Sequence, residues 1–104
     1  MNTKARSEAR RFLERLRGGP LTFGRMLASV RRADEIVQAD LARRMGISRA
    51  KLCDIENGRR TVTVERAAQF ARVLGYSVNQ FVAVAVEDQL RQAGLRVKVR
   101  LEAA

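Results

Sequence analysis

The sequence predicts an all-α domain of five or six helices, followed by a short β-strand at the C-terminal end. Apolar residues recur at helical spacing over most of the 104 residues, which indicates helices with one buried face. Serine or threonine precedes several of these segments and glycine follows them, as expected of helix caps. Only the last residues change to strict alternation of apolar and charged side chains, which is typical of a strand.

Glycines divide the chain into three parts. Residues 1–20 predict a basic amphipathic helix that is closed by a Gly-Gly-Pro linker. Residues 21–94 contain the remaining helices of the domain, and residues 95–104 contain the strand and a tail. A chain of this length supports one hydrophobic core. The residues that we expect to cap helices at their N-terminal ends are Thr22, Ser48, Thr63 and Ser77.

The segment that begins at Phe81 permits two readings. Residues 81–86 are Phe-Val-Ala-Val-Ala-Val, which by propensity alone also suits a buried strand. A cap at Ser77 and good helix formers over residues 87–93 favour a helix. We therefore predict one continuous helix that ends near Gly94.

The charge of the chain is strongly positive. Lys and Arg number 21 against 11 acidic residues, for a formal charge of +10, and there is no histidine to titrate near neutral pH. Such a field attracts nucleic acid, an anionic membrane surface or an acidic protein. Most of the basic residues are arginine, whose forked donors suit phosphates and guanine edges. We therefore expect double-stranded nucleic acid as the partner and no membrane.

Several classes of protein are disfavoured by what the sequence lacks. A lone cysteine, Cys53, cannot form an internal disulfide, and there is neither a secretory signal nor an apolar run of about 18 residues. We therefore expect a soluble, cytoplasmic protein. The sequence has no histidine, no phosphate-binding loop and no cluster of metal ligands. We accordingly expect no catalytic site, no metal and no cofactor.

Residues 38–58 carry the most specific pattern, and they read Q-A-D-L-A-R-R-M-G-I-S-R-A-K-L-C-D-I-E-N-G. Two short helices separated by about three residues with a glycine have the spacing of a helix-turn-helix. Gly46 permits the tight turn, and Leu52 and Ile55 anchor the second helix against the first. An exposed helix start with basic and short polar side chains fits the major groove of B-DNA, about 12 Å wide. The outward residues of that helix are Arg49, Ala50, Lys51 and Asp54.

The same stretch closely resembles the Xre/Cro family of phage-repressor-like helix-turn-helix proteins, and the resemblance extends from about Leu21 to Phe81. It implies a lambda-repressor-like DNA-binding domain with a recognition helix from Ser48 to Asn57. The residues that the resemblance assigns to base reading are Arg49, Ala50 and Asp54. Those that it assigns to phosphate or groove contacts are Gln38, Ser48, Lys51, Asn57, Arg59 and Arg60.

The resemblance also implies a structural ion pair between Arg31 and Glu56 that holds the recognition helix in place. The chain departs from the family pattern at two positions. Relatives usually have serine or threonine where this chain has Val37, so the first helix of the motif lacks its usual cap. They often have a proline where this chain has Thr61-Val62-Thr63.

The C-terminal alternation predicts a dimer, because a lone strand needs a partner and the chain offers no second strand. Antiparallel pairing across a two-fold axis satisfies this need. A register centred on Val99 sets Arg96 opposite the partner's Glu102, whereas a register centred on Lys98 opposes Arg96 to Arg100. The apolar residues that we expect at the dimer interface are Phe81, Val84, Leu95, Val97, Val99 and Leu101.

Together these features predict a sequence-specific DNA-binding transcriptional regulator, a repressor, that binds a palindromic operator as a homodimer. The two half-sites would lie about 34–36 Å apart. An alternative stays open, since many similar small proteins are antitoxins of type II toxin–antitoxin systems. In that reading the basic N-terminal helix and the segment after Gly94 contact a toxin protein, and the dimer represses the shared operon.

Overall fold

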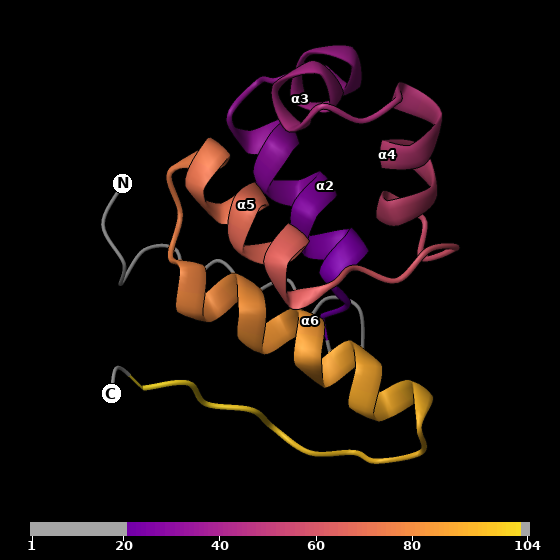
Figure 1. Ribbon diagram of the computed structural model, residues 1–104, viewed down its shortest axis with the longest axis vertical. Coiled ribbons are helices and arrows are strands. Elements are labelled where there is room, and N and C mark those ends of the chain that lie inside the picture. The colour runs from indigo at the N-terminus through magenta and orange to yellow at the C-terminus, as the bar shows by residue number, and fades with distance from the viewer. Residues whose placement is uncertain (1–20, 103–104) are drawn as a thin grey trace.

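The computed structural model describes residues 21–102 as five helices around one hydrophobic core. The helices are α2 (Phe23–Ala33), α3 (Gln38–Met45), α4 (Arg49–Glu56), α5 (Val64–Leu74) and α6 (Val78–Gln92). Helix α2 crosses the middle of the molecule, with α3 above it, α4 to one side and α5 and α6 to the other side and below (Figure 1). The all-α prediction is confirmed for this part of the chain. The basic helix and the linker predicted for residues 1–20 lie outside the described residues.

Local capping fixes where the helices begin and end. The hydroxyl groups of Thr22, Ser48, Thr63 and Ser77 each accept a hydrogen bond from the backbone N–H three residues further on, so these four predicted caps are confirmed. Helix α3 begins after Val37 with no capping side chain, as its sequence predicts. It ends at Gly46, whose φ of 69° lies in the left-handed region that glycine adopts without strain.

Aromatic side chains join the helices at the centre of the core. The ring centroid of Phe23, at the start of α2, lies 6.0 Å from the ring centroid of Phe70 in α5 and 5.9 Å from that of Phe81 in α6. The second pair is edge-to-face, a favourable geometry for aromatic rings. Helix α6 is therefore tied to the beginning of α2, and the continuous helix predicted across residues 81–86 is confirmed.

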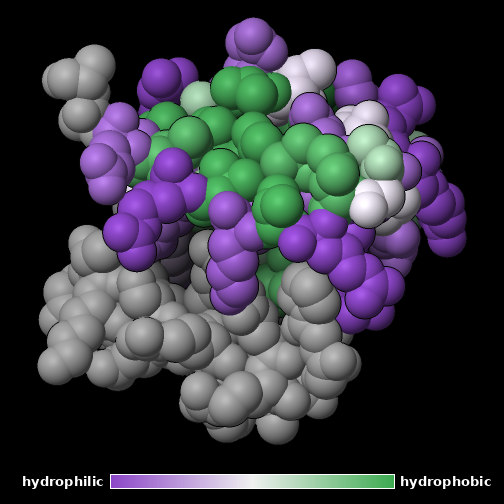
Figure 2. Space-filling view, turned by 90° about the horizontal axis from the view of Figure 1, so that it is seen from below, coloured by the Kyte–Doolittle hydropathy of each residue, from purple (hydrophilic) through white to green (hydrophobic). Residues whose placement is uncertain are grey.

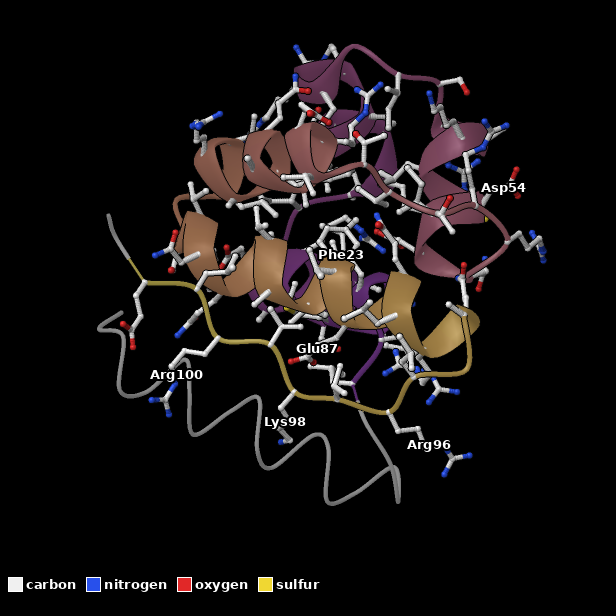
Figure 3. The ribbon with its side chains drawn as sticks, turned by 60° about the horizontal axis from the view of Figure 1, so that its bottom comes forward. Phe23, Asp54, Glu87, Arg96, Lys98 and Arg100 are labelled. Carbon is white, nitrogen blue, oxygen red and sulfur yellow. The ribbon has the colours of Figure 1, made fainter. Side chains whose placement is uncertain are left out.

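The β-strand predicted for the C-terminal end is not present in the described residues 95–102, so that part of the fold prediction is wrong. Residues 95–102 are neither helix nor strand and run as an extended segment alongside α6 (Figures 1 and 3). The backbone N–H of Val99 donates to the Glu87 carboxylate at 3.1 Å, and the Asn79 side-chain amide lies 3.4 Å from the Leu101 carbonyl oxygen. A strand requires backbone hydrogen bonds to a neighbouring strand, which residues 21–102 do not provide.

Candidate nucleic-acid interface

Helices α3 and α4 form a compact unit joined by residues 46–48. The backbone N–H of Ile47 donates to the Ala42 carbonyl at 3.0 Å, which closes the end of α3. The Ser48 hydroxyl then accepts the Lys51 N–H at 3.0 Å and starts α4. One residue in the left-handed conformation and one cap thus turn the chain between two helices of eight residues each.

Helix α4 packs one side against the core and leaves the other side accessible. Leu52 and Ile55 face inward, with exposed fractions of 0% and 2%. Arg49 and Ala50 are exposed at the start of the helix, whereas Lys51 and Asp54 are half-buried. Asp54 lies at the edge of the molecule, away from the core (Figure 3). The structure therefore places the three residues predicted to read bases on the outer side of one helix.

Asp54 and Arg59 contact each other, which the sequence analysis did not foresee. An Arg59 guanidinium nitrogen lies 3.1 Å from an Asp54 carboxylate oxygen, and the exposed fractions of the two side chains are 66% for Arg59 and 39% for Asp54. The family resemblance assigns Asp54 to bases and Arg59 to phosphates, as separate contacts. In the free protein the two groups are instead partners across the end of α4.

The end of α4 is closed by a side chain that was predicted to contact phosphate. The Asn57 amide nitrogen donates to the Cys53 carbonyl at 2.9 Å and lies 3.3 Å from the Cys53 sulfur. The amide group is thus folded back onto α4. Arg60, two residues beyond Gly58, is exposed and forms no ion pair with any described residue.

Arg31 and Glu56 lie in contact, where the resemblance implied an ion pair. Two guanidinium nitrogens of Arg31 donate to the two carboxylate oxygens of Glu56, at 2.7 and 3.0 Å. A third nitrogen donates to the Ile36 carbonyl at 2.8 Å. The hydrogen bonds to Glu56 raise the pKa of Arg31 above its ordinary value, although burial acts in the opposite direction.

Gln38 belongs to the same buried network, although the sequence analysis expected it at phosphate. Its side-chain amide donates to Glu56 at 2.9 Å. The carboxylate of α4 is therefore bonded to side chains at the end of α2 and at the start of α3. The network fixes the position of α4 relative to the two preceding helices.

Two further contacts of α2 were missed in the sequence, one with α4 and one with α6. Gly24 of α2 lies against the end of α4, so closely that a Cβ atom there would lie 2.4 Å from the Ile55 carbonyl oxygen and 2.7 Å from that of Glu56. Asp88 of α6 accepts the Phe23 N–H at 2.7 Å and so caps the start of α2. Burial raises the pKa of the Asp88 carboxyl, despite that hydrogen bond and the neighbouring Arg91.

The residues predicted for dimerisation fall into two groups. Phe81 and Val84, with exposed fractions of 2% and 0%, lie in the core of the chain itself and offer no surface to a second copy. This corrects the expectation for both, which rested on an apolar run that the chain buries against its own helices. The side chains that remain accessible are those of the C-terminal segment, Leu95, Val97, Val99 and Leu101.

Residues 21–102 present neither a metal centre nor a membrane span. Within this range no group of three or more Cys, Asp or Glu side chains is placed to hold a metal ion. None of the helices that the structure describes is long and apolar enough to traverse a lipid bilayer.

The arrangement of α3 and α4, with α4 anchored on one side and accessible on the other, is that of a helix-turn-helix DNA-binding protein. The sequence pattern of the helix-turn-helix domain family matches residues 22–81, more than half of the chain, and the chain belongs to this family. None of the curated proteins compared with the chain matches it.

A solved structure with a similar fold is that of ClgR, the clp gene regulator of Corynebacterium glutamicum. It is 29% identical in sequence, with a TM-score of 0.55, over 69% of this chain and 77% of ClgR. The shared region is therefore most of both chains.

Proposed function

We propose that this protein is a sequence-specific DNA-binding transcriptional regulator, a repressor, that inserts α4 into the major groove. The observation that carries the proposal is the division of α4 into a buried side, with Leu52 and Ile55, and an accessible side that begins with Arg49 and Ala50. A helix of this kind presents base-reading side chains when its start enters the groove. The formal charge of +10 and the similarity to a protein described as a gene regulator support the proposal.

Each predicted contact has a chemical counterpart on DNA. Arg49 matches the acceptors O6 and N7 of guanine, Ala50 the methyl group of thymine, and Asp54 the amino group of cytosine. Arg60 and Lys51 suit phosphate oxygens, which fix the register of the protein without reading sequence.

The experiment that tests the proposal is selection of bound sites from random duplexes, followed by affinity measurements on the selected site over a salt series. We expect Arg49→Ala to change the preferred bases. Arg60→Ala should keep the preference and reduce the salt slope by about 0.9, the value for one lost phosphate contact. The matched control is Arg72→Ala, an exposed arginine on α5, which should change neither. Equal affinity of the parent for every duplex would overturn sequence-specific binding.

We further propose that the protein binds a palindromic operator as a homodimer formed by residues 95–102. On the lower side of the molecule in Figure 1, a continuous hydrophobic area extends over the face shared by α6 and this segment (Figure 2). Within residues 95–102, Leu95 and Val97 are each 52% exposed. An accessible apolar area next to an extended backbone suits pairing with a second copy.

The charges of the segment favour one pairing register. The Val99 N–H and the Leu101 carbonyl both face α6, so the backbone groups of Lys98 and Arg100 face the other way and are open to a second strand. Antiparallel pairing through those groups is possible with the two-fold axis at Val99 or at Lys98, and the axis at Lys98 opposes Arg96 to the partner's Arg100. We propose the register with its axis at Val99. It sets Arg96 opposite the partner's Glu102, at the cost of setting Lys98 opposite the partner's Arg100.

Oligomeric state measured by sedimentation tests this second proposal. Val97→Asp should convert a dimer to a monomer, because it places a carboxylate in the apolar interface. Val64→Asp, at a similarly exposed valine at the start of α5, is the matched control and should remain dimeric. A monomeric parent at tens of micromolar, or equal behaviour of the two variants, would overturn it.

A further inference from the structure

A polar groove runs along α2 on the side where α4 ends. It has a volume of about 570 Å³ and is bounded by α2, the C-terminal end of α4, residues 57–62 and the C-terminal half of α6. Gly24 lies in its wall, where the absence of a side chain lets α2 approach the carbonyl groups of Ile55 and Glu56. The groove is thus built by the same close contact that positions α4.

The charge lining this groove is positive. Arg25, Arg32 and Arg60 line it, and all three are exposed and form no ion pair with another residue of the described range 21–102. Its two acidic residues already have partners. Glu56 binds Arg31 and Gln38, and Asp88 binds Arg91 and the Phe23 N–H. The guanidinium groups of Arg25, Arg32 and Arg60 are therefore not neutralised within the groove.

The spacing of the arginines suits a ligand with several separate anionic groups. Arg25 and Arg32 are seven residues apart on α2, so they project from the same side of the helix about 10 Å apart along its axis. The groove is also lined by Arg60, which is one of the residues expected to contact phosphate beyond α4. Through Arg60 the groove adjoins the proposed DNA surface.

We propose that this groove binds phosphate groups of the DNA backbone beyond the base pairs that α4 reads, with Arg25 and Arg32 as phosphate-binding residues. The inference rests on the proposed function and extends it by a second region of contact. Arg25 and Arg32 neutralise backbone charge without reading bases, so they add affinity that depends on salt and not on sequence.

The test uses the full chain, the selected operator duplex and the variants Arg25→Gln, Arg32→Gln and their double. Arg72→Gln on α5 is the matched control, because it removes the same charge from outside the groove. We expect each groove variant to reduce the salt slope by about 0.9 and the double variant by about twice that amount. Base preference should stay that of the parent, and Arg72→Gln should keep the parent slope. Unchanged slopes in the groove variants would overturn the inference.

A second arm separates DNA phosphate from a free phosphorylated compound as the ligand. Binding of inorganic pyrophosphate is measured by calorimetry in the absence of DNA. If the variants lose pyrophosphate binding but keep the parent salt slope, the groove serves a small ligand and the DNA assignment is overturned. If the parent binds all duplexes equally while the groove variants still lose salt slope, the groove assignment stands and sequence-specific regulation fails.

Discussion

Replacing Arg31 by methionine tests whether the buried ion pair holds the helix-turn-helix unit together. Arg31 donates two hydrogen bonds to Glu56 and one to the Ile36 carbonyl. The Gln38 amide donates a third hydrogen bond to Glu56. The two charged side chains are only 9% and 4% exposed. After Arg31→Met, the Glu56 carboxylate stays buried with one neutral donor.

The expected loss follows from that geometry. Removing one partner of a buried pair costs about 3 to 5 kcal/mol, out of roughly 5 to 15 kcal/mol for a whole domain. At about 4 to 8 °C per kcal/mol for a domain of this size, the melting temperature falls by at least roughly 12 °C. Glu56→Gln keeps the shape and one acceptor but leaves the Arg31 charge without its counter-ion, so we expect a loss in the same range of about 3 to 5 kcal/mol.

Urea and thermal unfolding followed by circular dichroism measure these losses. The double variant Arg31→Met with Glu56→Leu removes both charges, so we expect it to recover most of the stability that Arg31→Met loses. Arg43→Gln breaks an ion pair with Asp40 whose side chains are 75% and 46% exposed, and it serves as the control, with a change within about 1 kcal/mol. The buried ion pair does not hold the unit together if Arg31→Met unfolds like Arg43→Gln, or if the double variant is no more stable than Arg31→Met.

Three further changes test other contacts. Gly24→Ala should lower the free energy of unfolding by about 1 to 3 kcal/mol in urea titrations, because its Cβ would clash with two carbonyl oxygens of α4. Ser48→Ala should cost about 0.5 to 2 kcal/mol in the same assay, and Ser48→Gly only a few tenths, since glycine also suits the cap position. Burial raises the pKa of Asp88 in the folded state, so its contribution to stability is fully present below the unfolded pKa and is lost as pH rises through the folded pKa. When the free energy of unfolding is measured from mildly acidic to neutral pH, that of the parent should therefore increase relative to that of Asp88→Asn as pH falls.

Each of these three expectations has a contrary result. A stabilised Gly24→Ala would mean that helix propensity, worth up to about 1 kcal/mol in favour of alanine, outweighs the close contact. Equal losses for the alanine and glycine variants of Ser48 would show that the hydroxyl does more than cap α4. A stability difference between the parent and Asp88→Asn that stays constant with pH, or that favours the variant in acid, would contradict the raised pKa.

The features that the sequence predicted are those with local causes. A cap such as Ser48 acts on the N–H three residues away, and the left-handed turn at Gly46 needs only glycine and its neighbours. The inward direction of Leu52 and Ile55 follows from their spacing on one helix. The accessible side of α4, on which the proposed function rests, was predictable for the same reason.

The features that sequence reasoning missed depend on tertiary packing between helices. Asp88 caps α2 from 65 residues away, and Gly24 matters only because α4 ends against it. Alternation of apolar and charged residues fits a strand and equally an extended segment beside a helix, so it did not show that Val99 would bond to Glu87. The apolar run around Val84 suited a core or an interface, and only the packing of α5 on α6 decided between them.

In the free protein, the contact between Asp54 and Arg59 competes with the proposed contacts of these two side chains with DNA. A solvent-exposed ion pair is worth about 0 to 1 kcal/mol, so its rupture weakens binding by up to roughly fivefold. A duplex that offers Asp54 a cytosine amino group and Arg59 a phosphate compensates both ions at once. A mismatched duplex compensates only the guanidinium and leaves the carboxylate facing bases without a donor. The free protein is the same reference for every duplex, so the Asp54–Arg59 contact lowers affinity for all sequences alike, and only the unpaired carboxylate in the complex disfavours a wrong sequence.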